Sequence, residues 1–580
     1  MSRLAKRVRQ ELEQPASGVA LLQSLMHVGG ISKQGLRKVL KTLGKDRHGL
    51  ESLGLDVANA VFFESVKHVE HLPMNNGDVF RWEMCHPCRL IAAMVSESPQ
   101  LNKLFTEVAN KRRDSEWSLM IQFDEYVPGD WRRPESNRKS MNLIFSFLDF
   151  GAQYLCHDEL WFIPISVRSS KIADVTGGWS HMFTRFLDIF LWSDNGIATA
   201  GVALTLAGSP YLLKANLRVC LADGEGLMKA LEWRGAGSIK PCFFHANVLK
   251  NNCRLTAVAG ADFVEVDCVD TRMFKSTDAR NLYDDVDSVV EVRRKVAAGT
   301  AAPAVLEDVM YVTGMAPTGH GLLSHPRVRM DIDVLRVFHV DWAHTCLQDG
   351  TMTNDLSFFV EACRQKAQLG ARFWETQLRS GWSFPFHTKI KQRALHRMFN
   401  EYRIPSEDHV HTVKGSITDI LGVYSLVRHI VETTPELNRP ELDLERTSFF
   451  KCCSVVDSIL TAKRLQVSLL EAAAYVREAN VQHLQALVAA YGKRAVKPKN
   501  HWIFDVADAM ERDDEWMFLP DALSLERLHI TVKQVALKVK NTTELNGPHS
   551  QHYALFKSSD WAMLAQKTGY VDRQRQLQRA

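Results

Sequence analysis

The sequence predicts an α/β fold in which a core built on a mixed five-stranded sheet follows a helical N-terminal region and is interrupted by a long helical insertion. Three observations predict this fold. Short segments of strand-favouring residues gather in the first half of the chain, helical periodicity dominates the second half, and several strands stop at an aspartate. The expected divisions are a helical region (1–115), the first part of the core (116–345), the insertion (346–489), the last part of the core (490–545) and a polar tail (546–580).

Length and composition are those of an ordinary globular protein with more than one domain. The 580 residues are 46% hydrophobic and 24% charged, so large cores can be buried. Lysine and arginine exceed aspartate and glutamate by 71 − 67 = 4, which permits nucleic-acid binding without arguing for it. The basic N-terminus lacks the apolar core of a signal peptide, and an odd count of 11 cysteines indicates reduced thiols inside a cell. The longest apolar stretch, residues 196–213, is broken by glycines and a proline, so we expect no membrane span.

The N-terminal region has the pattern of paired helices. Residues 19–44 form two amphipathic runs joined by Gly29 and Gly30, and Ser32 is a suitable N-cap for the second run. A DNA-reading helix-turn-helix is one interpretation, and an ordinary helical hairpin with a solvated basic face is the commoner one. The basic residues of the second run are Lys33, Arg37, Lys38 and Lys41.

Five strand candidates and one helix follow in a definite order. The first three strands have short connections, which favours an antiparallel meander, and an amphipathic helix separates them from the fourth. The fourth strand stops at Asp223 and the fifth at Asp341. The strand candidates are residues 118–124, 140–151, 159–167, 215–222 and 334–341, and the helix covers residues 177–192.

This order of strands and helices is that of the RNase H-like fold. In that fold the ends of the first and fourth strands are neighbours, so Asp124 and Asp223 should converge although 223 − 124 = 99 positions separate them. A lone aspartate at a strand end is more often a turn former. For Asp124 and Asp223 together, the strand order favours a shared site over two separate turn formers.

Two converging aspartates suit chemistry on phosphodiesters. Two Mg²⁺ or Mn²⁺ ions can activate an oxygen nucleophile and stabilise a leaving oxygen, and such hard ions need two to four carboxylates within roughly 8 Å of each other. Glu526, on a late amphipathic helix with a basic face, is our candidate for the third acid, and Asp341 is the next. His344 follows Asp341 by three residues and is a candidate to act near a scissile phosphate, although a core histidine is the ordinary alternative.

A second candidate metal site follows Asp223. Cys242 and His245 have zinc-ligand spacing, but one close pair is half of a site. Completion by Cys253 or Cys268 with Asp267 or Asp270 is open, and so is a structural turn without metal. Cys85 and Cys88 form another close pair, which we interpret as structural.

Taken together, these blocks resemble the eukaryotic DDE/D DNA transposases of the CACTA, Plavaka and KDZ group, more distantly hAT elements, and transposase-like proteins of single-celled algae. The resemblance covers about residues 70–545 and rests on the order of its blocks. The blocks are Asp124-Glu125 with Pro128-Gly129, Asp223 followed by Cys242-x-x-His245, Asp341-Trp342-x-His344, Lys497-Pro-Lys-x-His501, and Glu526-Arg-x-His529.

The resemblance implies an RNase H-like core that cleaves DNA and transfers strands with Mg²⁺ or Mn²⁺. Asp124 and Asp223 would be metal ligands and Glu526 the third acid. It further implies double-stranded DNA as partner, a homo-oligomer, a nuclear setting and no membrane.

The sequence also departs from that family. Asn500 and Asp505 stand in a segment where relatives often have a second histidine, and Gly224 stands where relatives usually carry a glutamate. Leu528 and Ile530 replace more basic residues. The three acids remain, but a domesticated protein that binds DNA or protein without catalysis is the alternative function, and an unrelated helical scaffold with an α/β domain is a third.

Overall fold

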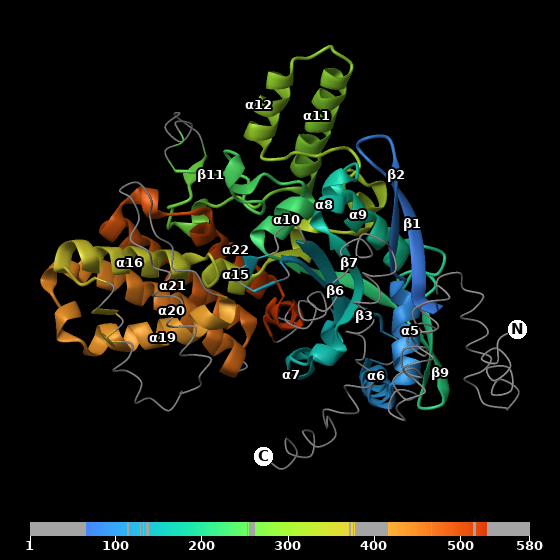
Figure 1. Cartoon of the computed structure of the whole chain (residues 1–580), viewed down its shortest axis with the longest axis horizontal. Helices are drawn as coiled ribbons and strands as arrows, with labels where there is room; N and C mark the ends of the chain where they lie inside the picture. Colours follow the sequence, from blue (N-terminus) through green and yellow to red (C-terminus); the bar gives the residue numbers. More distant parts are fainter. Residues whose placement is uncertain are drawn as a thin grey trace, which may run out of the picture.

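The computed structural model describes most of the chain between residues 65 and 529 (Figure 1). The helix-turn-helix expected in residues 19–44, the polar tail and the end of the last core segment lie outside the described residues. Within the range, the structure does not describe residues 113–114, 128, 131–132, 135–138, 252, 254–261, 371–372, 375, 378–415, 466 and 514–517.

A mixed five-stranded sheet forms the centre of the α/β part, as the sequence predicts. Its spatial order is β13-β10-β3-β6-β7. The strands β3, β6 and β7 form an antiparallel meander, and β10 and β13 run parallel to β3 on its other side. The strands are β3 (Trp117–Tyr126), β6 (Ser140–Phe147), β7 (Phe162–Arg168), β10 (Ala215–Ala222) and β13 (Phe338–Val340).

The two faces of the central strand β3 meet different parts of the chain. Side chains alternate along a strand, so Trp117 and Phe123 share one face. Trp117 stacks on Phe105 of α6 (Pro99–Arg112), and Phe123 contacts Phe183 of α9 (Gly178–Leu187). The opposite face, which carries Gln122 and Asp124, meets residues 521–529 from the end of the described chain.

A hairpin corrects the helical interpretation of residues 1–115. Strands β1 (Lys67–Pro73) and β2 (Val79–Cys85) pair antiparallel, joined by a turn in which Gly77 has φ of +88°. Alternating residues such as Val69, His71 and Phe80 favour strands, and Asn76-Gly77 is a turn signal. Helices α5 (Pro87–Glu97) and α6 then follow as expected.

Two other segments differ in detail from the sequence interpretation. The fifth strand is shorter than expected, because residues 334–337 form α14, whose first turn is capped by the Asp333 side chain. The apolar stretch 196–213 forms a hairpin of β8 (Val202–Leu206) and β9 (Ser209–Leu213). Among the described residues, no helix has both the length and the apolar content needed to cross a bilayer.

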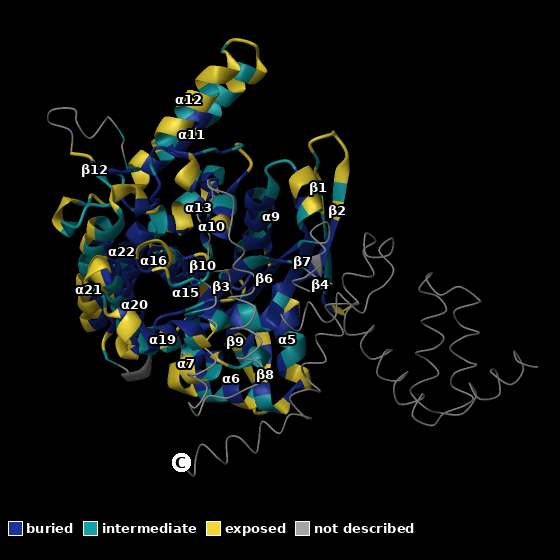
Figure 2. Ribbon diagram, turned by 60° about the vertical axis from the view of Figure 1, so that its left-hand side comes forward, coloured by how far each residue is buried: buried dark blue, intermediate teal, exposed yellow. Residues whose placement is uncertain are grey.

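Long helices make up most of the described part of residues 351–512, at the left of Figure 1, and helices α16, α20 and α21 pack against one another. They are α16 (Thr351–Ala367), α19 (Ile417–Thr433), α20 (Asp443–Leu465), α21 (Leu469–Tyr491) and α22 (Pro498–Arg512). Figure 2 shows the buried sheet and a projecting hairpin of α11 and α12 with exposed faces. The remaining helices are α7 (Ala152–Leu155), α8 (Ser169–Asp174), α10 (Gly224–Leu231), α11 (Ala279–Ala297), α12 (Pro303–Thr313), α13 (Pro326–Asp331) and α15 (Trp342–Cys346), and the remaining strand pairs are β4 (Gly129–Asp130) with β5 (Arg133–Pro134) and β11 (Val248–Leu249) with β12 (Val264–Glu265).

Candidate functional site

Three aspartates lie side by side where neighbouring parallel strands of the sheet end. The register pairs Phe123 with Ala222 and Ala222 with Val340, so the residues that follow them are also neighbours. Adjacent strands are about 4.8 Å apart, which places Asp124, Asp223 and Asp341 in a row at the carboxyl ends of three parallel strands.

Glu526 and His344 join Asp124 in this row. One ligand atom from each of the three side chains lies within 4.8 Å of the others. The Nε2 atom of His344 is 3.4 Å from the Glu526 Oε1 atom, and the Nδ1 atom of His529 is 3.8 Å from the Asp124 Oδ2 atom. We call Asp124, Asp223, Glu526 and His344 the carboxylate cluster.

Burial and neighbouring charges shift the pKa values of Asp124 and His344 in the carboxylate cluster. Burial raises the pKa of Asp124 well above its usual value, and the negative charges of Asp223 and Glu526 raise it further. Burial lowers the pKa of His344, but hydrogen bonds to Asp341 and Glu526 outweigh it and raise that pKa strongly. Burial and the neighbouring acids therefore both disfavour the ionised form of Asp124.

Asp341 serves a different purpose from the other acids. Its Oδ2 atom accepts hydrogen bonds from the His344 backbone N–H at 2.9 Å and from His344 Nδ1 at 2.6 Å. Its Oδ1 atom accepts one from the Ala522 backbone N–H at 3.0 Å, and the residue is fully buried. With both oxygens engaged, Asp341 orients His344 and anchors the segment that leads to Glu526.

Packing explains why position 224 is a glycine, where the resemblance to transposases leads us to expect a glutamate. Asp223 caps α10, with its Oδ1 atom accepting the Gly226 backbone N–H at 2.6 Å. A Cβ at position 224 would lie 2.6 Å from the Trp502 ring. The departure therefore lets α22 pack against the start of α10.

Glu125 is held away from the carboxylate cluster although it follows Asp124 directly. It accepts hydrogen bonds from Ser169 and Lys229, and its Oε2 atom is 2.7 Å from Lys139 Nζ. Burial would raise its pKa, but these partners lower it to about 2. Glu125 is thus ionised, and its negative charge is balanced by lysines at the rim of the site.

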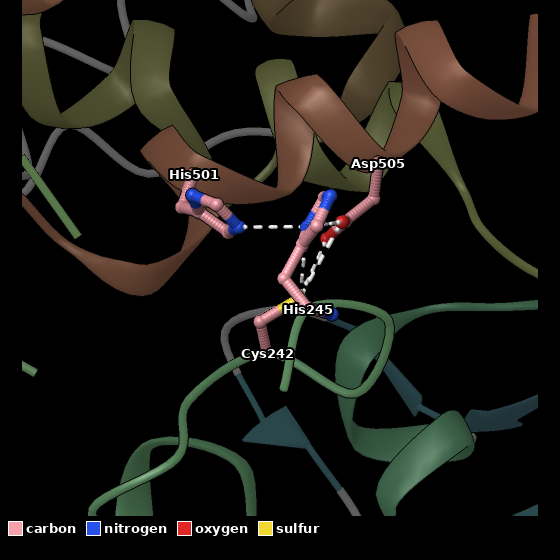
Figure 3. A group of neighbouring side chains, drawn as sticks. All are labelled: Cys242, His245, His501 and Asp505. Carbon is pink, nitrogen blue, oxygen red and sulfur yellow. Dashed lines mark hydrogen bonds and ion pairs between the residues drawn. The ribbon is translucent and has the colours of Figure 1, made fainter. Parts of the chain in front are cut away.

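A second cluster, which we call the Cys242 group, consists of Cys242, His245, His501 and Asp505 (Figure 3). The His245 Nδ1 atom lies 3.7 Å from Cys242 Sγ, 3.1 Å from His501 Nε2 and 2.8 Å from Asp505 Oδ1. Around a tetrahedral zinc ion, ligand atoms are about 3.3–3.6 Å apart, given bond lengths near 2.0 Å to nitrogen and 2.3 Å to sulfur. The four side chains are buried and could hold such an ion, with the contacts of 2.8 and 3.1 Å widening slightly to admit it.

The surroundings of the Cys242 group also resemble those of a metal site. The second ring nitrogen of His245, Nε2, lies 3.2 Å from Asp508 Oδ2, the carboxylate contact that commonly orients a metal-binding histidine. Burial would lower the pKa of His245, but Asp505 and Asp508 raise it strongly, whereas burial and His245 lower the pKa of His501. The clustered charges and ring nitrogens suit a cation held between them.

The structure brings His501 and Asp505 to Cys242 and His245, in place of the partners considered from the sequence. Neither Cys253 nor Cys268 belongs to this group, and Asp267 instead lies 3.0 Å from Lys493. His501 and Asp505 are four residues apart on α22, which places both on one helix face. That spacing was a usable signal, but it does not say which loop the face meets.

Comparison with known proteins gives no family. No protein-family model matches the chain, and no curated protein matches it.

Proposed function

We propose that this chain is a metal-dependent nuclease with an RNase H-like core, of the DDE/D transposase class, that cleaves DNA phosphodiesters and transfers strands. The observation that supports the proposal best is the meeting of Asp124 with Glu526 from a distant segment. Asp223 follows the adjacent strand and is near enough for its charge to raise the pKa of Asp124, although it does not belong to the same group of ligand atoms within 4.8 Å. The sheet order, with an antiparallel meander followed by two parallel strands, is the order expected for such a core.

The residues of the carboxylate cluster fit Mg²⁺ or Mn²⁺. Asp124, Asp223 and Glu526 offer hard oxygens, and a divalent cation beside Asp124 would offset the neighbouring negative charges that help to raise its pKa. When bound, such ions activate an oxygen nucleophile and stabilise the leaving oxygen. His344, oriented by Asp341, holds a proton at Nε2 beside Glu526. Lys139 and Lys229, at the rim, are paired with Glu125, and they could contact a DNA backbone only by exchanging that partner for a phosphate.

Nicking of supercoiled double-stranded DNA tests this proposal. We expect Mg²⁺- or Mn²⁺-dependent nicking by the full chain and a loss of roughly a hundredfold or more in Asp124→Asn, Asp223→Asn and Glu526→Gln. Glu436→Gln, an exposed residue of the helical part, is the matched control and should retain activity. Equal nicking by the wild type and Asp124→Asn, or none by either, would favour a domesticated protein that binds without catalysis.

For the Cys242 group we propose a structural zinc ion that ties the 242–245 loop to α22. The donor set of one sulfur, two ring nitrogens and one carboxylate is typical of zinc. Trp502 strengthens the same junction, because its Nε1 atom donates to the Pro241 carbonyl oxygen at 2.9 Å. The double-stranded DNA partner, the homo-oligomer and the nuclear setting that the resemblance implies belong to this proposal as well.

A further inference from the structure

A fully buried carboxylate lies in the core of the long helices, away from the two clusters already described. Asp355 of α16 is 1% exposed. Its Oδ2 atom accepts a hydrogen bond from Ser448 Oγ at 2.7 Å and lies 2.9 Å from His483 Nε2. Among the described residues no lysine or arginine pairs with it, and Lys366 is bound instead to Glu445 at 2.5 Å.

Three helices each bring one potential ligand to this point. Asp355 lies on α16, Cys452 on α20 and His483 on α21. One ligand atom from each lies within 4.8 Å of the others, and we call the three residues the Asp355 group. Metal sites in helical bundles are built in this way, from inward side chains on facing helices.

Several buried polar atoms at this point have no hydrogen-bond partner. They include the Asp355 Oδ1 atom, the His483 Nδ1 atom and the Thr351 hydroxyl. A buried polar atom without a partner costs about 1–3 kcal/mol, and a buried charge costs more. An ion between the ligands would give the Asp355 carboxylate a compensating charge.

We propose that Asp355, Cys452 and His483 bind a divalent cation of the zinc class. Sulfur, imidazole nitrogen and carboxylate oxygen together favour zinc over magnesium. On binding, the Cys452 thiol releases its proton to solvent and the sulfur bonds the ion, so the charges of one thiolate, one carboxylate and one divalent cation sum to zero. A water molecule or the Thr351 hydroxyl completes four ligands.

Such an ion would fasten α16, α20 and α21 to one another. This places it outside the carboxylate cluster and gives it a structural task in the helical part of the chain that follows the last strand of the sheet. The inference stands independently of the proposed nuclease activity, because neither its ligands nor its test involve DNA.

Titration with Co²⁺ tests the proposal, because cobalt replaces zinc and its bond to a thiolate absorbs light. The full chain carrying Cys242→Ala, which removes the thiolate of the Cys242 group, is freed of metal and titrated. We expect a thiolate-to-cobalt charge-transfer band whose intensity corresponds to one thiolate-bound Co²⁺ per chain, and a melting temperature that rises on binding. Adding Cys452→Ala should abolish the band.

The neighbouring Cys453 provides a matched control. It is as buried as Cys452 and lies on the same helix, but it does not belong to the Asp355 group. Cys242→Ala with Cys453→Ala should keep the band, and far-ultraviolet circular dichroism checks that each variant folds. Absence of the band in folded Cys242→Ala protein, or its persistence in the Cys452 variant, would reduce the Asp355 group to an ion pair and overturn the proposal.

Discussion

At the scale of single residues, Asp124 lowers the stability of the metal-free protein and is also a proposed metal ligand. It is held among other acids by the sheet register, and its pKa is raised because burial and the charges of Asp223 and Glu526 disfavour ionisation. Residues held in this way commonly reduce stability for the sake of function. The same repulsion that costs stability in the metal-free chain would attract a cation.

We therefore expect Asp124→Asn to stabilise the metal-free protein at neutral pH. A carboxyl group whose folded pKa is raised contributes stability below its unfolded pKa, and that stability is lost as the pH rises through the folded pKa. At pH 7.5 in chelator, Asp124→Asn should be more stable by about 0.5–2 kcal/mol in denaturant unfolding. The gain should shrink toward pH 4, and a variant less stable than the wild type at pH 7.5 would contradict the argument.

Stabilisation by Mn²⁺ should show the opposite dependence on pH. Because the cation binds the ionised carboxylates, its effect on the melting temperature should be small near pH 4 and grow toward pH 7.5. In Asp124→Asn the shift should be much reduced at every pH. An equal shift in both proteins would place the metal elsewhere.

The Cys242 group predicts a loss of bound zinc on single substitution. Cys242→Ala should carry one equivalent of zinc less than the wild type by elemental analysis and should melt at a lower temperature, because the ion ties the 242–245 loop to α22. Cys268→Ala, in the same region but outside the group, is the control and should keep the wild-type zinc content. Equal zinc in both variants would contradict the assignment.

At this scale, a site residue could be predicted from the sequence where it ends a strand or lies a few positions from another ligand. Asp124 and Asp223 are of this kind, and so is the pair Cys242 and His245. The partners of that pair were not predicted, because His501 follows His245 by 501 − 245 = 256 positions and only packing brings them together.

At the scale of elements, the 523–529 helix is placed by contacts just before it. The Asp521 carbonyl oxygen accepts a hydrogen bond from Gln122 Nε2 at 2.8 Å, and Ala522 donates to Asp341. Lys463 of α20 forms an ion pair with the Asp521 side chain and lies 5.4 Å from the Trp342 ring centre. The long helices and the sheet therefore both hold the segment that carries Glu526.

Lys463→Met should lower metal-dependent nicking by roughly tenfold, about 1.4 kcal/mol in the activation barrier, without unfolding the protein. The Mn²⁺ concentration needed for half-maximal nicking should rise, because Glu526 is less well positioned, and Lys463→Arg should recover part of the loss. Lys451→Met, on the same helix but bonded to Gln482, is the control. If the Lys463→Met protein had the wild-type dependence on Mn²⁺, Lys463 would have no part in positioning Glu526.

Elements with strong local patterns were predicted, and those decided by a cap or a turn were not. The order of β3, β6, β7 and β10 followed from apolar runs, whereas the strand expected in residues 334–341 begins as a helix because Asp333 caps it. The β1–β2 hairpin has alternating residues and an Asn-Gly turn. It was not predicted, because the segments on both sides of it have helical patterns and the whole region was interpreted as helical.

At the scale of the whole molecule, the carboxylate cluster is made from segments that the long helices separate. Asp124 and Glu526 are 526 − 124 = 402 positions apart, yet their carboxylates meet across the face of β3 that carries Gln122. The strand order could be predicted because parallel strand ends share an edge. The packing of residues 521–529 on that face could not, since it depends on tertiary contacts with Asp341 and Lys463.

This separation has a consequence during protein synthesis. At about 5–20 residues per second, a ribosome needs roughly 20–80 s to add the residues between Asp124 and Glu526. Throughout that interval the nascent chain already holds the strands with both aspartates but lacks the third acid. A nuclease built in this order could not assemble its acids during that interval, so its synthesis would not expose nearby nucleic acid to a half-made enzyme.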